Sequence, residues 1–245
     1  MRIGIIVQAR MGSTRFPGKV LKEIQGKSLL ELQFNRLKRS QKVDNVIIAT
    51  SYESNDDCIA ELCHDLSIPC FRGSEKDVLE RYYLAAKHYD LDVIIRTNGD
   101  CPFIDATIID NLISIWQLNF PRFDYVSNIL EETFPLGMHI EIFSLSAIKR
   151  ALDESIADDE HEHVTAYIYR NKKIFNVLNV RNDQNFSRYR WTVDYPEDFT
   201  FVEEIYKRFG VDDSSFGMHD IVTLLEAEPE LLKINSYYKK KQNII

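Results

Sequence analysis

The stretch that decides the fold runs Ile3-Gly-Ile-Ile-Val-Gln-Ala-Arg-Met-Gly-Ser-Thr-Arg-Phe-Pro-Gly-Lys-Val-Leu21 in a chain of 245 residues. Its first part, residues 3–7, is a short apolar run of the kind that forms a buried strand. The part that follows is rich in glycine and carries Arg10, Arg15 and Lys19. Glycines let a backbone bring its N–H groups close to a ligand, and guanidinium and ammonium groups bind phosphate oxygens. The stretch therefore predicts a phosphate-binding loop after the first strand of an α/β sheet.

Two familiar phosphate-binding motifs do not match this loop. A Walker A loop has four residues between its glycines and a Ser or Thr after its lysine. Here five residues separate Gly12 from Gly18, and Val20 follows Lys19. The dinucleotide-binding pattern G-x-G-x-x-G is also absent. An ordinary surface turn with scattered basic residues stays open as the alternative, although the residue types favour phosphate binding.

Composition and charge narrow the class of protein. With 44% hydrophobic and 28% charged residues, the chain has the composition of a globular protein. It has no apolar run of ~20 residues and no secretory signal, which predicts a cytoplasmic protein without a membrane partner. The net charge of −8 argues against a nucleic-acid partner. Residues 1–42 nevertheless hold ten Lys or Arg and two acidic residues, which suits a small anionic ligand in that segment.

Strands and helices are predicted to alternate along the first half of the chain. Ser28-Leu-Leu-Glu31 reads as a helix capping box, and Ser74-Glu-Lys-Asp77 as a second cap. Alternation of this kind predicts a three-layer α/β fold with a mostly parallel central sheet. The predicted strands are residues 3–7, 46–50, 69–72, 92–96 and 124–127, and the predicted helices start at residues 29, 51, 78 and 106.

After residue 134 the pattern is less regular. Strands are predicted at residues 138–143, 174–180 and 189–193, with helices at 144–152, 158–169, 196–209 and from 218 onward. Residues 239–241 read as a frayed, solvated tail. No repeat or linker divides the chain, so residues 1–245 are predicted to form a single α/β domain.

Two aspartates are placed where such a sheet binds ligands. Asp100 follows the strand predicted at residues 92–96, and Asp194 follows the one predicted at 189–193. Because ligands of parallel sheets lie beyond the carboxyl ends of the strands, both could meet at one edge and hold Mg²⁺. The residues alone leave other roles open. Asp100 fits a turn as well as a metal site, and Asp194 fits a helix N-cap better than a metal site. The pair Asp90 and Asp92 has the spacing of a glycosyltransferase metal motif but starts a strand, which is the wrong end.

Five motifs in order resemble one enzyme family. Residues 7–19 closely resemble the signature of the acylneuraminate and 3-deoxy-manno-octulosonate cytidylyltransferases, and the rest looks most like the spore coat polysaccharide biosynthesis F-type branch. The supporting segments reach to about residue 210: Phe71-Arg-Gly-Ser-Glu-Lys-Asp-Val-Leu-Glu-Arg-Tyr-Tyr83, Thr97-Asn-Gly-Asp-Cys-Pro102, Phe134-Pro-Leu-Gly-Met-His-Ile-Glu-Ile-Phe143, Glu162-His-Val-Thr165 and Arg190-Trp-Thr-Val-Asp-Tyr-Pro-Glu-Asp198.

The resemblance implies a nucleotide-diphospho-sugar transferase (GT-A-like) fold and cytidylyl transfer from CTP. It implies that Asp100 and Asp194 are a Mg²⁺ pair, and that Arg10, Lys19 and Asp100 form the catalytic centre. The residues that it implies for nucleotide binding are Gln8, Ala9, Arg10, Met11, Gly12, Ser13, Thr14, Arg15, Lys19, Arg72, Gly73, Ser74 and Asn98.

The acceptor side is less well defined by the resemblance. His139 and Glu141 are expected to bind a sugar acid, sugar or phosphate-type acceptor, although His139 stands where the family pattern has Asp. Residues 134–180 are expected to form the acceptor side and a homodimer contact. A glycosyltransferase on the same general fold and a nucleotide-binding protein without catalysis are the alternatives.

Overall fold

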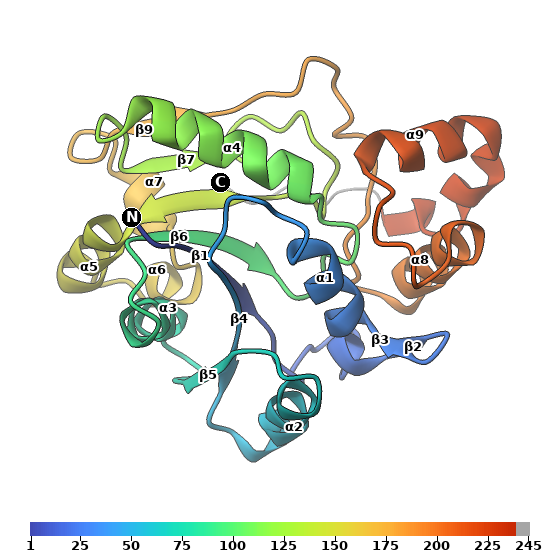
Figure 1. Ribbon diagram of the computed structural model, residues 1–245, viewed down its shortest axis with the longest axis horizontal. Helices are drawn as coiled ribbons and strands as arrows, with labels where there is room; N and C mark the ends of the chain where they lie inside the picture. Colours follow the sequence, from blue (N-terminus) through green and yellow to red (C-terminus); the bar gives the residue numbers. More distant parts are fainter. Residues whose placement is uncertain (239–245) are drawn as a thin grey trace.

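The computed structural model describes residues 1–238 and is centred on a seven-stranded sheet (Figure 1). The strand order is β5-β4-β1-β6-β8-β7-β9. Strand β8 is antiparallel to both of its neighbours, and the other six strands run in one direction. The expected α/β fold with a mostly parallel sheet is therefore confirmed. The strands are β1 (Ile3–Gln8), β4 (Asn45–Ser51), β5 (Cys70–Gly73), β6 (Val93–Asn98), β7 (Tyr125–Ser127), β8 (Glu141–Ser144) and β9 (Val177–Asn179).

Helices cover both faces of this sheet, as Figure 1 shows. One core lies between the sheet and α1 (Leu29–Leu37), α2 (Asp57–Asp65), α4 (Ala106–Asn119), α8 (Pro196–Phe209) and α9 (Met218–Ala227). The second core lies between the opposite face and α3 (Val78–His88), α5 (Leu145–Glu154) and α7 (Ala166–Arg170). Shorter elements complete the chain: β2 (Glu23–Ile24), β3 (Lys27–Ser28), α6 (Asp158–Glu162), η1 (Lys19–Leu21), η2 (Ser54–Asp56), η3 (Pro229–Lys233) and η4 (Ser236–Tyr238).

Strand β1 lies in the middle of the sheet because both of its faces are apolar. Ile5 and Val7 point into one core and Ile6 into the other, and all three are fully buried. The strand pairs with β4 on one side and with β6 on the other, both in parallel. The buried strand predicted at residues 3–7 is confirmed, and it brings the basic loop to the carboxyl end of the sheet.

Two predicted elements of the second half are wrong. Residues 189–193 do not form a strand, because among residues 1–238 only an isolated bridge between Leu136 and Arg190 pairs them with another segment. The helix predicted at residues 158–169 is split into α6 and α7, and Val164 between them adopts a φ of 52°. A residue with positive φ cannot continue a right-handed helix.

The capping predictions were half right. Ser28 caps α1 and accepts a hydrogen bond from the Glu31 N–H at 3.1 Å. Ser74 does not cap α3, because Asp77 holds that position and accepts from the Glu80 N–H at 2.8 Å.

The solvated tail predicted at residues 239–241 lies outside the described residues. Within residues 1–238, no helix combines the length and the apolar character needed to cross a lipid bilayer.

Candidate active site

The loop after β1 and the turn after β6 lie against each other because the two strands are paired in register. Gln8 at the end of β1 lies opposite Asn98 at the end of β6. Just beyond, the Gly99 N–H donates to the Gln8 carbonyl at 2.9 Å, and a Cβ on Gly99 would lie 2.9 Å from that same oxygen. Glycine is thus required for this close approach. The Asn98 carbonyl is held from the other side by the Gln33 amide at 2.8 Å.

Lys19 joins the basic loop to both predicted aspartates. Gly18 takes a left-handed conformation with a φ of 69°, and Lys19 then starts the short helix η1. The lysine is 8% exposed, and its Nζ donates to Asp100 Oδ2 at 2.7 Å, to Asp194 Oδ1 at 3.1 Å and to the Val193 carbonyl at 2.6 Å. Burial alone would lower the pKa of Lys19, but the charges of Asp100 and Asp194 outweigh it and raise that pKa above its ordinary value. The two aspartates therefore lie close together as expected, but only Asp100 follows a strand, since the strand predicted before Asp194 is absent.

Asp194 is surrounded by cations and does not cap a helix. Besides Lys19, it contacts Arg15 at 2.8 Å and Arg190 at 3.0 Å. Burial opposes ionisation of Asp194, yet Lys19 and then Arg15 lower the pKa of this carboxyl below its usual value. The N-cap of α8 is Tyr195, so the alternative interpretation of Asp194 as an N-cap is wrong.

The loop itself is folded around the Met11 peptide. The Met11 carbonyl accepts from the N–H groups of Ser13 at 2.9 Å and Gly18 at 3.1 Å. The Met11 N–H donates to Asp56 Oδ1 at 2.7 Å, which ties the loop to η2. Gly12 and Thr14 are exposed, and among residues 1–238 no partner accepts from their N–H groups. The N–H groups of Gly12 and Thr14 can therefore donate to a ligand, whereas that of Ser13 is used inside the loop, and backbone contacts with a nucleotide stay a prediction.

The other residues predicted in this loop differ in exposure. Gln8 and Met11 are half-buried, as is Ser13, whereas Ala9 is buried and donates its N–H to the Ala49 carbonyl at 3.1 Å. Arg10 is exposed, and the Arg15 side chain is 53% exposed. Both guanidinium groups can therefore reach a ligand outside the loop.

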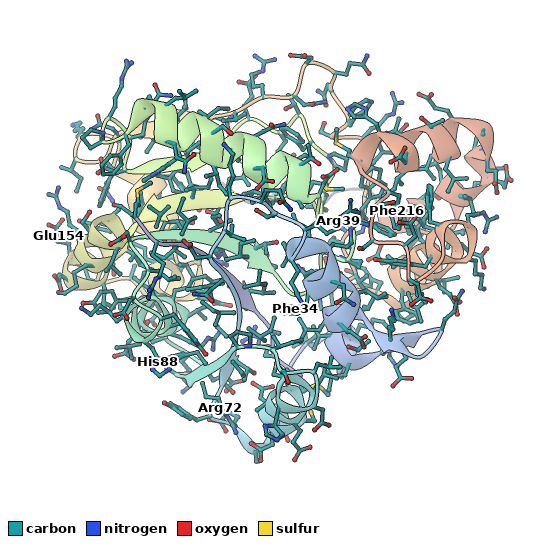
Figure 2. All side chains as sticks on the ribbon, in the orientation of Figure 1. Phe34, Arg39, Arg72, His88, Glu154 and Phe216 are labelled. Carbon is teal, nitrogen blue, oxygen red and sulfur yellow. The ribbon has the colours of Figure 1, made fainter. Side chains whose placement is uncertain are left out.

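Arg72, Gly73 and Ser74 lie at the end of the edge strand β5, where Figure 2 labels Arg72. The Arg72 guanidinium is held by the Ser51 carbonyl at 2.8 Å, the Glu53 carbonyl at 3.1 Å and Asp57 at 2.7 Å. Gly73 lies against the Arg81 side chain, and the Ser74 hydroxyl accepts from the Asp77 N–H at 3.0 Å. These contacts explain the local structure, and nucleotide binding by the three residues stays a prediction.

The predicted acceptor residue Glu141 belongs to a buried polar network. It is 4% exposed, forms an ion pair with Arg96 and accepts from the Tyr125 hydroxyl at 2.7 Å and from the Thr165 hydroxyl. Arg96 also donates to Gln8 Oε1 at 3.3 Å, so the network reaches the start of the basic loop. His139 is half-buried and lies two residues before Glu141.

Several residues of this site were missed by the sequence prediction. Arg96 was included in a predicted strand without a role, although a cation directly after the apolar residues 93–95 is a signal that could have identified it. Arg190 and Asp198 begin and end the motif at residues 190–198. Their positions in that motif did not indicate that both would contact Asp194. Asn235, which contacts both, has no local signal at all.

The chemistry of the donor set fits Mg²⁺ bound together with phosphates. Asp100 and Asp194 supply hard carboxylate oxygens that lie within 3.1 Å of the same ammonium group. Their side chains are 21% and 18% exposed, so both can be reached from solvent. No cluster of three or more His, Cys, Asp or Glu suited to a metal occurs in residues 1–238. Magnesium typically needs only one or two protein carboxylates when the substrate supplies phosphate oxygens.

Known proteins share this sequence over nearly its whole length. The profile of the cytidylyltransferase family matches residues 4–241. The uncharacterised protein MJ1063 of Methanocaldococcus jannaschii is 37% identical over 243 residues, which are 98% of this chain and 97% of that protein. The spore coat polysaccharide biosynthesis protein SpsF of Bacillus subtilis is 33% identical over 232 residues, which are 92% and 94% of the two chains.

Solved structures share the fold. A cytidylyltransferase from Leptospira borgpetersenii has a TM-score of 0.90 at 33% identity, covering 100% of this chain and 99% of that one. A CMP:2-keto-3-deoxy-manno-octonic acid synthetase complexed with CTP has a TM-score of 0.65 at 15% identity, covering 85% and 99%. This second likeness shows the nucleotidyltransferase fold alone. From the family profile and the two full-length relatives, we conclude that this chain belongs to the cytidylyltransferase family.

Proposed function

We propose that this protein transfers a cytidylyl group from CTP to a sugar acid, sugar or phosphate-type acceptor and releases pyrophosphate. Membership of the cytidylyltransferase family supports CTP as the substrate. The observation that carries the proposal is the position of Lys19, whose ammonium group binds Asp100 and Asp194 together. A role in surface polysaccharide or glycan synthesis is supported by the similarity to the Bacillus subtilis spore coat protein.

In the proposed reaction an acceptor oxyanion attacks the α-phosphorus of CTP. A bond forms between that oxygen and the α-phosphorus, while the bond from the α-phosphorus to the bridging oxygen breaks and pyrophosphate leaves with the electron pair. Arg10, Arg15 and Lys19 would neutralise the charge on the triphosphate and on the leaving group. Catalysis of this kind depends mainly on positioning and electrostatic stabilisation, so no nucleophile from the protein is needed.

Asp100 and Asp194 are the residues that would hold Mg²⁺. When bound, the ion would supply positive charge to the phosphate oxygens and help to orient them. Lys19 now lies between the two carboxylates, and the proposal requires its ammonium group to turn toward the triphosphate when the substrate binds.

The acceptor is proposed to bind on the side of His139 and Glu141. Glu141 contacts Arg96, and Arg96 contacts Gln8, so this side is linked to the basic loop by direct contacts. A homodimer formed through residues 134–180 is part of the same proposal.

The test measures pyrophosphate release from CTP with Mg²⁺ and a panel of acceptors: acidic eight- and nine-carbon sugars, neutral sugars and phosphate-bearing alcohols. We expect turnover with one acceptor class, and a loss of about 100-fold or more in Asp100→Ala, because a preorganised charged group is removed from the reacting phosphates. Lys27→Ala is the control, since Lys27 is bound to Asp212 on the surface. Unchanged turnover in Asp100→Ala would remove Asp100 from the proposed centre.

The same assays separate the two alternatives. A nucleotide-binding protein without catalysis would be stabilised by CTP in a thermal shift and would release no pyrophosphate with any acceptor. A glycosyltransferase would instead use a nucleotide-sugar donor. Asp90 and Asp92 have the spacing that could have supported a glycosyltransferase. Both residues lie before β6 and contact Arg2, at the opposite end of that strand from Asp100.

A further inference from the structure

A buried group of three residues lies behind Asp194, and the proposed chemistry gives it no role. Its centre is Asp198 in the first turn of α8, whose side chain is fully buried. The two Asp198 oxygens accept from Arg190 Nε at 2.9 Å and Nη2 at 2.8 Å, and from the N–H groups of Asp194 at 2.9 Å and Tyr195 at 3.1 Å. A fifth hydrogen bond comes from Asn235 Nδ2 at 3.1 Å. With so many donors, the Asp198 carboxylate has little freedom to rotate.

Arg190 connects this group to the Asp194 carboxylate. Its Nη2 donates both to Asp198 Oδ2 at 2.8 Å and to Asp194 Oδ2 at 3.0 Å. Lys19 and Arg15 contact the other oxygen, Asp194 Oδ1, at 3.1 and 2.8 Å. Burial would lower the pKa of Arg190, but the hydrogen bonds and charges of Asp198 and Asp194 together outweigh it and raise that pKa. One oxygen of Asp194 is therefore held from behind, and the other is directed toward the basic loop.

Asn235 closes the group from the far end of the chain. It is 6% exposed, and its Nδ2 donates to the Arg190 carbonyl at 3.1 Å as well as to Asp198 Oδ1. The short helix η3 precedes it, contacts both α8 and α9, and buries Leu231 in the core. The position of Asn235 is thus set by packing, which is what holding another group in place requires.

We propose that Arg190, Asp198 and Asn235 are positioning residues that orient Asp194 toward the CTP triphosphate and its metal ion. The inference rests on the proposed function, since it assigns a supporting group to one of that function's carboxylates. A purely structural alternative is that the three residues only fix the start of α8 and the C-terminal segment. The two differ in a measurable way, because a displacement of about 1 Å in a reacting centre can cost 100-fold in rate without unfolding the protein.

The test uses Asn235→Ala, which removes the outermost donor and leaves every charged residue in place. Ile221→Val in the core of α9 is the control for stability, with a cost of about 1 kcal/mol. Pyrophosphate release and CTP binding by calorimetry are measured well below the unfolding temperature, with Mg²⁺ and with EDTA. Asn235→Ser, which keeps a smaller donor, is used if the alanine variant does not fold.

We expect Asn235→Ala to lower kcat about tenfold, and to raise KM for CTP in Mg²⁺ by no more than the Mg²⁺-dependent gain in affinity shrinks. The affinity for CTP in EDTA should match the wild type, because Arg15 and Lys19 are retained, and the gain in affinity caused by Mg²⁺ should shrink. Equal values for Asn235→Ala and Ile221→Val in all measurements would overturn the proposal. So would a loss of CTP affinity that is the same with and without Mg²⁺.

Failure of the proposed function gives a different pattern. Wild-type protein would then release no pyrophosphate with any acceptor. The Mg²⁺-dependent part of CTP binding would still distinguish Asn235→Ala from Ile221→Val if the positioning group acts on Asp194.

Discussion

Gly137 shows how one residue joins the predicted acceptor segment to the segment that carries Asp194. Its φ is 105°, and a Cβ there would lie 2.8 Å from the backbone N of Thr192 and the backbone carbon of Trp191. The same contact is held by the Trp191 N–H, which donates to the Leu136 carbonyl at 2.7 Å. Only glycine permits the two backbones to pack this closely, two residues before Asp194.

We expect Gly137→Ala to lower the free energy of unfolding by about 3 kcal/mol, from positive-φ strain and a backbone clash together. Gly26→Ala is the matched control, since Gly26 has a φ of 82° but nothing within 4 Å of the added Cβ. Gly26→Ala should lower the free energy of unfolding only by the positive-φ strain, about 1 kcal/mol. Urea unfolding measures both, and equal losses in the two variants would show that the close packing at Gly137 is unimportant.

At the scale of elements, the start of α3 tests the correction to the predicted cap. Asp77→Ala removes the acceptor for the Glu80 N–H and the contact with His161 Nδ1 at 2.8 Å. We expect a loss of about 1–2 kcal/mol in unfolding free energy. Ser74→Ala should cost clearly less, because Ser74 supports only a turn, and Asp77→Asn should retain most of the capping energy. Thermal and urea unfolding rank the three variants by their loss of unfolding free energy. A larger loss in Ser74→Ala than in Asp77→Ala would contradict the prediction.

Elements whose signals are local were predictable from the sequence, and those that depend on a distant partner were not. The cap at Ser28 and the buried strand β1 need only neighbouring residues to be recognised. Residues 189–193 have the composition of a strand, yet within residues 1–238 they form only one bridge, to Leu136. Their other backbone hydrogen bonds go to Phe186, Asp100, Lys19 and Asn235. Composition favours a strand there, but tertiary packing decides the outcome.

On the scale of the whole molecule, buried tyrosines make stability sensitive to alkaline pH. Burial raises the pKa of Tyr82 and of Tyr206 to about 12, and it raises the pKa of Tyr125 as well. In the unfolded chain these groups ionise near pH 10. Because the folded pKa is higher, the unfolded state loses protons first, and stability that is fully present below pH 10 falls as the pH rises toward 12.

We expect each such tyrosine to reduce the free energy of unfolding by about 1 kcal/mol at pH 11 relative to pH 9. Urea unfolding at pH 8, 9, 10 and 11 measures the slope. Tyr206→Phe should be less stable at pH 8, since it loses the hydrogen bond to the Pro102 carbonyl at 3.0 Å, but its slope should be smaller. A free energy that does not change between pH 9 and 11 would contradict the prediction.

The topology of the sheet explains how much of the candidate site could be predicted. Asp100 was expected at the carboxyl end of the sheet and follows β6, whereas Asp194 arrives there without a strand of its own, through the hydrogen bond from the Val193 N–H to the Asp100 carbonyl. Lys19 binds both aspartates. Arg96, Arg190 and Asn235 belong to the same site through contacts between segments that are far apart in sequence. Apart from the single cation Arg96 among the apolar residues of its strand, side-chain geometry of this kind has no period or spacing that a sequence pattern could reveal.

The hydrogen bonds of Asn235 also bear on how the protein is made. Chains generally fold from the N-terminus during synthesis, so β1, β4, β5 and β6 can pair long before residue 235 has been added. The sheet could thus assemble, with Asp100 and Lys19 in place, while the group behind Asp194 still lacks one of its donors. A chain that ends before Asn235 would then be folded over most of its length and poorly active, so a gene truncated near its end would lose activity without its product being misfolded.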